Sequence, residues 1–323
     1  MFGMPSHLSS EVMHNQSAVT EFVLLGLSQN PRVQKIAFLV FLLVYIATMG
    51  GNMLVIVTIV CTPTLLGCPM YFFLVFLSSL DACFSSVITP KAIADTLHER
   101  NTISYEGCLI QVFGVHFLAG AEVIVLTAMA YDRYVAICKP LHYPSIMNWR
   151  LCGILMGIAL TGGFLHSMIQ ISFTFHLSFC GSRVIDHIMC DLYPLLKLAC
   201  NDTHILHLLV FANSGSFCIL IFSMLLVSYG VILFSLRNHS SEGRKKALST
   251  CGSHVAVVVL FFVPCIFMYA RPPSAYFFDK FVAIFCTTLT PLLNPMIYTF
   301  RNKDMKSARR KLCKRLVVLS DEK

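Results

Sequence analysis

Long apolar runs dominate this chain and are separated by short polar segments. Runs of about 18 residues or more can cross the hydrocarbon core of a bilayer as helices. Such runs lie at 36–60, 70–90, 109–131, 151–174, 205–234, 247–270 and 278–299. The pattern predicts an all-α membrane protein, a seven-transmembrane helix bundle whose two termini lie on opposite sides of the membrane.

Composition supports the membrane interpretation. Of the 323 residues, 56% are hydrophobic and only 12% are charged, whereas about a quarter of a soluble domain is charged. Residues 1–35 contain no compact apolar stretch after a basic start, so we expect no cleavable signal peptide. We therefore expect an extracellular N-terminal tail over 1–35, a seven-transmembrane domain over 36–299, and a cytoplasmic amphipathic helix and tail over 300–323.

Basic residues indicate the orientation, because cytoplasmic loops are enriched in Lys and Arg. With the N-terminus outside, most of the 24 Lys and Arg residues face the cytoplasm. Arg32 and Lys35 oppose the trend locally, because they flank the first span on the outer side. The total nevertheless predicts an extracellular N-terminus and a cytoplasmic C-terminus.

The segment after the seventh span is basic and amphipathic. Its apolar residues recur at helical spacing, at Met305, Ala308, Leu312 and Leu316. Such a segment is expected to lie along the inner leaflet of the bilayer. Cys313 is a candidate for palmitoylation there.

Three segments match the N-glycosylation pattern, and two of them face the lumen in this orientation. Asn15 is the favoured acceptor because it lies in the free N-terminal tail, and Asn201 is the second candidate.

Four of the 14 cysteines stand at the outer side, and most of the others are expected to be small packing residues within spans. Cys108 opens the third span, and Cys180, Cys190 and Cys200 lie in the long second outer loop. An oxidising compartment favours disulfides among these four, and three connectivities remain open. A metal site at His187, Cys190 and Asp191 is disfavoured because a disulfide would use the thiolate. His187 is expected to be a solvated loop residue.

Charged side chains inside spans are costly and usually functional. Asp81 and Glu122 are the two carboxylates well inside spans, and Asn52 and Asn294 lie at comparable depth. These four residues are expected to share a hydrated cavity. Two interpretations remain open: a cation- or proton-dependent switch, with Na⁺ as the candidate ion, and static hydrogen bonding between helices.

Two spans have features that suggest signal transmission. One face of the third span carries Val112, Val115, His116, Ala119, Glu122 and Val123, and Arg133 follows almost three turns later. In the sixth span, Pro264 should kink the helix. Either feature is also compatible with passive packing.

The stretch MAYDRYVAICKPLHY, from Met129 to Tyr143, resembles the signature of olfactory receptors, which are rhodopsin-like G-protein-coupled receptors. Further motifs are similar to that family in the same order along the chain. They are Gly51-Asn52, PMYFFLVFLSSLD from Pro69, KALSTCGSHVAVV from Lys246 and PLLNPMIYTFRN from Pro291. The chain looks like the larger, tetrapod-type class (class II) of these receptors.

The resemblance implies the disulfides Cys108–Cys190 and Cys180–Cys200, and a sodium-site region around Asp81 and Glu122. It implies a G-protein switch formed by Asp132, Arg133, Tyr134, Tyr229, Asn294, Pro295 and Tyr298. It also implies an odorant pocket between the third, fifth, sixth and seventh helices, lined by Val112, Val115, His116, Ala119, Asn213, Phe217, Cys265, Ile266, Tyr269, Ile284 and Thr287.

The function implied is binding of small, mostly neutral volatile odorants, with a stimulatory olfactory G protein as partner and cyclic AMP as the signal. The expected location is the plasma membrane, and no enzyme activity or nucleic-acid partner is expected. Val115 stands where amine receptors carry an acidic anchor, which argues against charged amines. Phe262-Val263-Pro264 departs from the family's usual Tyr-Gly in the sixth helix. The alternatives are a metabolite chemoreceptor outside the nose, and a transporter or channel, against which the chain has no internal repeat.

Overall fold

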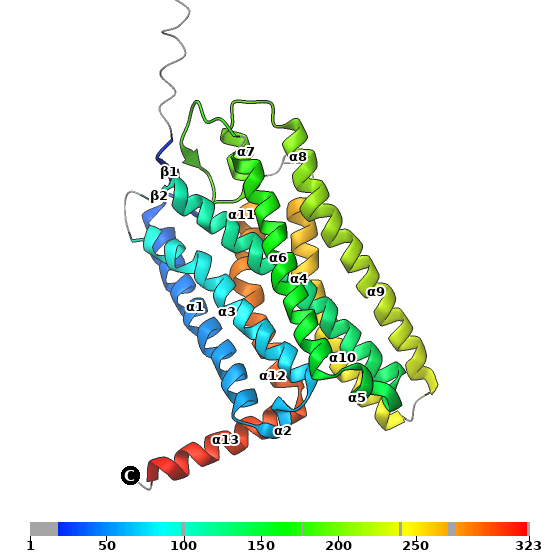
Figure 1. The fold of residues 1–323 in the computed structure, drawn as a ribbon. Helices are drawn as coiled ribbons and strands as arrows, with labels where there is room; N and C mark the ends of the chain where they lie inside the picture. The colour runs from blue at the N-terminus through cyan, green and yellow to red at the C-terminus, as the bar shows by residue number, and fades with distance from the viewer. Residues whose placement is uncertain (1–18, 98–100, 176, 239–240, 271–275, 322–323) are drawn as a thin grey trace, which may run out of the picture.

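The computed structural model describes residues 19–97, 101–175, 177–238, 241–270 and 276–321. Within these ranges, seven helical segments are long and apolar enough to cross a membrane. They pack side by side as an elongated bundle, in agreement with the predicted architecture (Figure 1).

The spanning segments begin and end close to the predicted positions. Single helices form the first four spans and the sixth: α1 (Pro31–Val60), α3 (Pro69–Asp95), α4 (Tyr105–Cys138), α6 (Trp149–Thr174) and α10 (Ser241–Tyr269). The fifth span comprises α8 (His204–Val210), a π-helical turn η2 (Phe211–Ser216) and α9 (Phe217–Ser235). The seventh comprises α11 (Tyr276–Ile284), a second π-helical turn η4 (Phe285–Leu289) and α12 (Thr290–Arg301).

Short elements connect the spans. On the side of the bundle where α13 (Lys303–Asp321) emerges lie α2 (Pro63–Leu66), α5 (Tyr143–Ile146) and the 3-10 turns η1 (Pro140–His142) and η3 (Leu236–Asn238). At the opposite end lies α7 (Leu192–Leu198) (Figure 1).

Local sequence explains several helix starts. Pro31 and Pro69 occupy the first helical turn, where the missing N–H costs nothing. Asn30, Ser104 and Asn148 accept backbone N–H hydrogen bonds as N-caps of α1, α4 and α6. The first span therefore begins at Pro31, five residues before the expected boundary at 36.

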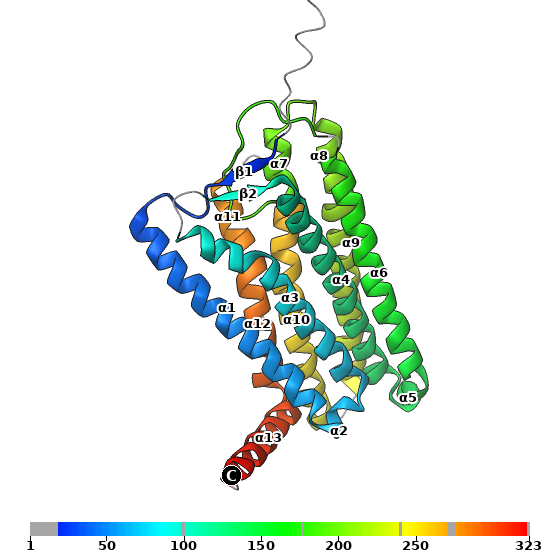
Figure 2. The ribbon, with the colours of Figure 1, turned by 60° about the vertical axis from the view of Figure 1, so that its left-hand side comes forward.

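A small sheet covers the end of the bundle opposite α13. Strand β1 (Glu21–Leu24) pairs antiparallel with β2 (Thr102–Ser104) and parallel with β3 (Val184–Ile185). Figure 2 shows the sheet above the helix ends. The expectation of a free tail over 1–35 was therefore wrong for residues 21–24, because the alternate side chains Phe22 and Leu24 are buried against the outer loops.

The two central helices are α3 and α4, and α4 packs along α6 through close backbone contact. Gly163 of α6 makes this possible, because a Cβ atom there would lie 2.5 Å from the carbonyl oxygen of Phe117 in α4. The outer helices α1 and α9 expose large apolar side chains such as Leu43, Leu220 and Val227. Apolar side chains facing outwards and a packed interior are what a lipid surround requires.

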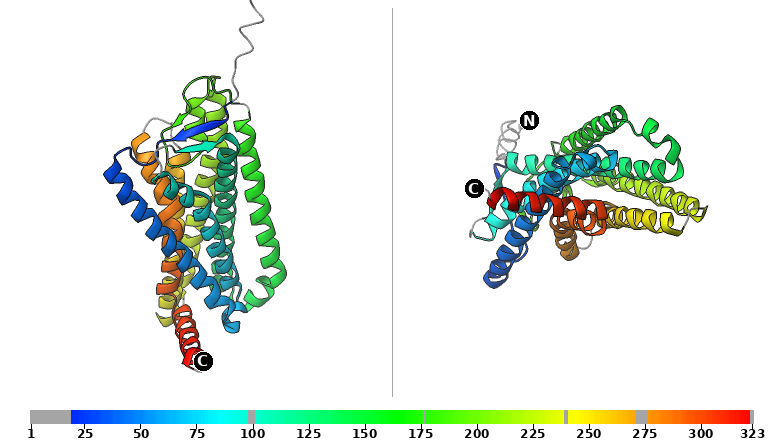
Figure 3. Two further views of the ribbon diagram at one scale, coloured as in Figure 1. Left: turned by 90° about the vertical axis from the view of Figure 1, so that its left-hand side faces the viewer. Right: turned by 90° about the horizontal axis from the view of Figure 1, so that it is seen from below.

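Helix α13 leaves the bundle at the end opposite the sheet and turns away from the bundle axis (Figure 3). Met305 and Ala308 are buried, whereas basic side chains such as Lys303, Arg310 and Lys314 are exposed. This agrees with the predicted amphipathic helix; the side chain of Leu316 lies outside the described residues.

Candidate functional site

The candidate ligand cavity lies between α4, α6, the fifth span, α10 and η4, in the half of the bundle nearer the sheet. It contains about 600 Å³ of space not filled by atoms, counting the part open to solvent. Seven of the residues named from the sequence line it: Val115, His116, Ala119, Phe217, Cys265, Tyr269 and Thr287.

The structure places four other predicted residues outside this lining. Val112 is buried in the outer apolar cluster beside Cys108 and Cys190, and Asn213 is hydrogen-bonded to His166. Ile266 and Ile284 pack against the main core. Asn213 and Ser214 both lie in the π-helical turn η2, whose wider turn changes the face on which each side chain points, and Ser214 lines the cavity in place of Asn213.

Sequence reasoning missed ten lining residues. His166 comes from the fourth span, which the pocket expectation omitted, although a histidine in an apolar run was a usable signal. Met189 comes from the second outer loop, and η4 brings Cys286 to the cavity beside Thr287. The remaining lining residues are Phe84, Gly120, Val123, Ser214, Cys218, Phe261 and Met268.

Asp191 is a buried carboxylate in the second outer loop that contacts two of the residues lining the cavity. Its Oδ2 accepts a hydrogen bond from the Tyr269 hydroxyl at 2.9 Å, and its Oδ1 accepts one from the Leu192 N–H at 2.7 Å. Nε2 of His116 lies 3.1 Å from the same Oδ1. Burial alone would raise the pKa of Asp191, but the His116 contact and the Leu192 N–H hold it below its usual value. The carboxylate therefore joins the outer loop to α4 and α10.

His187 is not the solvated residue that the sequence suggested. Its side chain is buried, and its Nδ1 accepts a hydrogen bond from the Met189 N–H at 3.4 Å. Burial lowers the pKa of His187 to about 4. Among the described residues no group of three or more His, Cys, Asp or Glu side chains is arranged to hold a metal ion.

Two disulfides tie the outer loop in the pairing that the resemblance implied. Cys108–Cys190 joins the start of α4 to the loop, with Cα atoms 5.4 Å apart. Cys180–Cys200 closes the loop on itself, with Cα atoms 5.8 Å apart.

The two buried carboxylates meet in the middle of the bundle. Nδ2 of Asn294 donates to Asp81 at 2.9 Å and 3.1 Å and to Glu122 at 3.5 Å, and Asp81 and Glu122 are hydrogen-bonded to each other. Asn52 does not join them as expected, because its amide donates to the carbonyl oxygens of Thr48 and Pro291.

A second hollow, the Arg133 hollow, lies nearer the α13 end. Its lining comprises Met70, Leu74, Met129, Arg133, Ser249, Thr250, Ser253, His254, Tyr298 and Asn302. Arg133 is paired with Asp132, and the Tyr143 hydroxyl donates to Asp132 at 2.7 Å. Burial and the Asp132 charge raise the pKa of Tyr143, so its hydroxyl stays a donor.

Other predicted switch residues surround this hollow. Tyr229 is hydrogen-bonded to His254, which joins α9 to α10. Tyr134 packs against the core, and Pro295 lies close to Gly51, where a Cβ would be 3.3 Å from the proline ring. Helix α4 continues to Cys138, so Asp132 and Arg133 lie inside the helix and not past its end, as the apolar run suggested.

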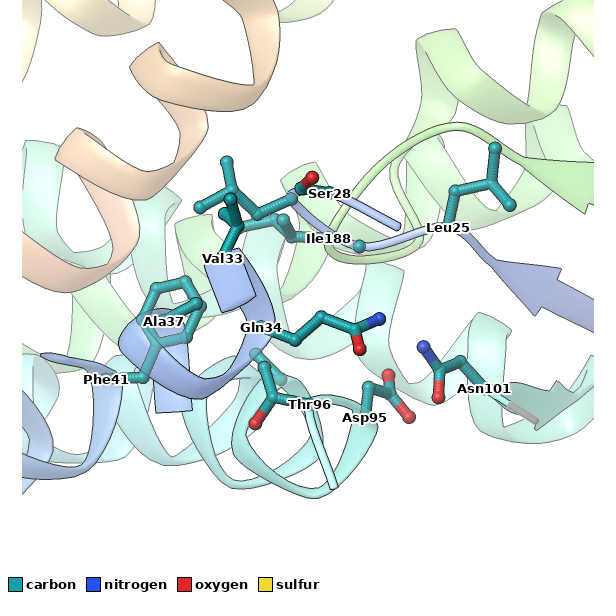
Figure 4. Close-up of a pocket in the computed structure, with 13 residues that line it drawn as sticks. Leu25, Ser28, Val33, Gln34, Ala37, Phe41, Asp95, Thr96, Asn101 and Ile188 are labelled. Carbon is teal, nitrogen blue, oxygen red and sulfur yellow. The ribbon is translucent and has the colours of Figure 1, made fainter. Parts of the chain in front are cut away.

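A third hollow lies beside the segment that follows β1 and shares no lining residue with the ligand cavity. Figure 4 shows the Gln34 amide of α1 facing Asp95 of α3 and Asn101 of the following segment. Asp95 is paired with Lys91 one turn earlier in α3. The N-terminal segment and the first two spans therefore line this hollow together.

The candidate modification sites differ in their surroundings. Asn15 lies outside the described residues. Asn201 is exposed, and its Oδ1 accepts a hydrogen bond from the Ser178 N–H at 3.3 Å. Cys313 is an exposed thiol on α13.

Comparison with known proteins gives one consistent result. The family model described as Olfactory receptor matches residues 41–315. The human protein Olfactory receptor 4A47 is 54% identical over 95% of this chain and 99% of its own length. Human Olfactory receptor 4S2 is 53% identical over 95% of this chain and 98% of its own, and mouse Olfactory receptor 4B13 is 53% identical over 92% and 97%.

Proposed function

The chain belongs to the olfactory receptor family, and from this premise we propose that it binds small, mostly neutral volatile organic molecules in the ligand cavity. With the ligand bound, it activates a stimulatory olfactory-type G protein, which raises cyclic AMP. Family membership makes it a receptor and not an enzyme. Its seven apolar helices fit a multi-pass protein of the plasma membrane.

The lining chemistry supports a neutral ligand. No Asp, Glu, Lys or Arg is among the described lining residues, and the polar groups there are hydroxyls and imidazoles such as Ser214, His116 and His166. Both carboxylate oxygens of the nearby Asp191 already have partners, His116 and Tyr269. A charged ligand would lose its hydration without gaining a counter-ion, whereas a small apolar molecule with one hydrogen-bonding group suits such a site.

One observation carries the proposed coupling: α10 lines both the ligand cavity and the Arg133 hollow. Phe261, Cys265 and Tyr269 contribute to the first, and Thr250 and His254 contribute to the second. Pro264 interrupts the backbone hydrogen bonding of the helix beside the ligand cavity. A ligand that favours a different tilt of α10 there would shift His254 away from Tyr229 and open the Arg133 hollow.

Arg133 is the proposed contact for the G protein. In this structure its guanidinium is held by Asp132. Opening of α10 would let Arg133 leave Asp132 and reach the partner. In the proposed orientation the N-terminus is outside the cell and Arg133 meets its partner on the cytoplasmic side. The proposed glycosylation sites are Asn15 and, as second candidate, Asn201. Cys313 of α13 is the proposed palmitoylation site.

Na⁺ is the proposed ion near Asp81 and Glu122. The oxygen donors there suit a hard cation, and Oδ1 of Asn294 is buried without a hydrogen-bond partner among the described residues. The direct Asp81–Glu122 hydrogen bond requires a proton on one of the two carboxyl groups. Na⁺ and that proton would therefore compete for the same oxygens.

A cyclic AMP reporter assay over a chemically diverse odorant panel tests the proposal. We expect at least one neutral small organic to raise cyclic AMP, and Arg133→Ala to abolish the response at unchanged surface expression. Val115→Phe, which fills the ligand cavity, should weaken the response at least tenfold in potency. Val227→Phe is the matched control, because Val227 is 68% exposed on the outer surface of the bundle.

Two results would reject the proposal. An odorant response unchanged by Arg133→Ala would remove the proposed switch. Ligand-dependent current or uptake in cells without the stimulatory G protein would favour a channel or transporter.

A further inference from the structure

Two free cysteines from different spans meet at the ligand cavity. Cys265 belongs to α10 and Cys286 to η4, and both line the cavity. Helix α10 packs against η4 there, the two side chains interact, and neither belongs to a disulfide. Single buried cysteines are explained by packing alone, but two thiols in contact also have a shared chemistry.

The backbone hydrogen bonding is interrupted next to Cys265 and altered at Cys286. Cys265 directly follows Pro264, which cannot donate a backbone hydrogen bond. Cys286 lies in the π-helical turn Phe285–Leu289, and such turns occur frequently at functional sites. The two cysteines therefore join the proline position of the sixth span to the π-helical turn of the seventh.

Both cysteines border the cavity, which gives a small reagent a route to them. Both side chains are partly exposed, whereas Cys218, on the α9 side of the same cavity, is buried. A cavity suited to small neutral molecules admits a small neutral oxidant of the peroxide class.

We propose that Cys265 and Cys286 form a redox modification site in the ligand cavity, which a peroxide closes into a disulfide that clamps α10 to η4. In the first step one thiol releases its proton and its sulfur attacks a peroxide oxygen; the O–O bond breaks, the departing hydroxide takes that proton and leaves as water, and the sulfur becomes a sulfenic acid. In the second step the other thiol attacks the sulfenic sulfur and a second water leaves. The two thiols lose two electrons and two protons in total, and hydrogen peroxide is reduced to two water molecules.

The disulfide would restrict the helix that lines both hollows. A covalent link beside Pro264 opposes any change of tilt between α10 and the seventh span. Oxidation should therefore lower the maximal odorant response, and a reductant should restore it.

The test is chemical and does not depend on a known odorant. Membranes containing the full chain are treated with hydrogen peroxide, free thiols are alkylated, and peptides are analysed by mass spectrometry without reduction. We expect a linked peptide pair containing Cys265 and Cys286, which disappears after dithiothreitol treatment and after Cys265→Ser or Cys286→Ser. Cys218→Ser is the matched control and should leave the linked pair unchanged. In the samples not treated with dithiothreitol, the linked Cys108–Cys190 peptides report that the protein has formed its native outer disulfide.

Recovery of Cys265 and Cys286 as separately alkylated peptides after peroxide treatment would overturn the proposal. Preferential linkage of either residue to Cys218 would overturn it equally. If the serine variants do not fold, the linked pair in the unmodified chain decides. Because this readout is a covalent bond, its failure is distinguishable from a failure of the odorant assay.

Discussion

The hydroxyl of Tyr269 in α10 donates a hydrogen bond of 2.9 Å to the carboxylate of Asp191 in the second outer loop. Both residues are buried, and His116 of α4 contacts the other carboxylate oxygen. The loop is thus joined to the helix that lines both hollows. A substitution that breaks the contact between the loop and Tyr269 should therefore alter the position of α10, and a movement of α10 should strain this contact.

Tyr269→Phe removes this hydrogen bond and leaves one carboxylate oxygen without its donor. We expect the receptor to lose about 1.5–3 kcal/mol of stability, the usual value for a hydrogen bond to a charged group. Thermal denaturation of purified protein measures the loss. A double-mutant cycle with Asp191→Ala, which removes the acceptor, should give a coupling energy above about 1 kcal/mol. Strict additivity of the two substitutions would contradict the contact.

Gly163→Ala should separate α4 from α6. The added Cβ would lie 2.5 Å from the Phe117 carbonyl oxygen and 2.7 Å from the Ala121 nitrogen. Both atoms are backbone and cannot rotate away, so we expect a loss of about 2–3 kcal/mol or more. Surface expression and thermal denaturation measure it.

Gly157→Ala is the matched control on the same helix, because a Cβ there meets nothing within 4 Å. It should be neutral or slightly stabilising, since Ala favours helix over Gly by about 1 kcal/mol. Equal behaviour of the two variants would show that the close approach of α4 and α6 is not required.

Acid should destabilise the outer loop through His187. Burial lowers the pKa of His187 to about 4 from an ordinary 6.5, so the folded state binds fewer protons than the unfolded state between these values. Stability is fully present above 6.5 and is lost as the pH falls through this window. Asp191 opposes the shift, and Lys197 and Lys280 add to it. Lowering the pH from about 7.5 to about 5 should cost about 2 kcal/mol through this residue.

Thermal stability of the detergent-purified protein as a function of pH measures this loss. His187→Gln should remove most of the loss between pH 7.5 and 5. His142→Gln is the control, because His142 is exposed. An unchanged pH profile in His187→Gln would show that burial of this imidazole does not cause the acid sensitivity.

Tyr143→Phe should raise the basal activity of the receptor. The Tyr143 hydroxyl stabilises the Asp132 carboxylate, which in turn holds Arg133. Losing about 1 kcal/mol from the inactive state shifts the equilibrium about fivefold toward the active one. Basal cyclic AMP, normalised to surface expression, measures the shift. Tyr131→Phe is the control, because Tyr131 is 43% exposed; equal basal signals in both variants would contradict the role of Tyr143.

Much of the fold was predictable from local sequence. Apolar runs predicted the spans because a bilayer requires about 20 apolar residues per helix, whatever their partners. Prolines and N-caps such as Asn30 act within one turn, so helix starts were close to their predicted positions. The meeting of Asp81 with Glu122 was also predictable, because depth along a helix follows from residue spacing alone.

Two of the errors come from contacts between distant segments. Residues 21–24 form a strand because two outer loops supply its partners, Thr102–Ser104 and Val184–Ile185. His187 is buried because the loop folds over it, and loop packing has no periodic pattern to read.

The sequence by itself determined a seven-span membrane protein of the olfactory receptor type, because hydropathy and local motifs act over a few helical turns. The tertiary structure alone decided which side chains share the cavity. Ser214 and Cys286 lie in the π-helical turns η2 and η4, and helix packing adds His166 to the same lining. The physical reason is that one extra residue in a helical turn rotates the rest of the helix about its axis and so changes which side chains face the cavity. Whether a helix adopts such a turn depends on the helices packed against it.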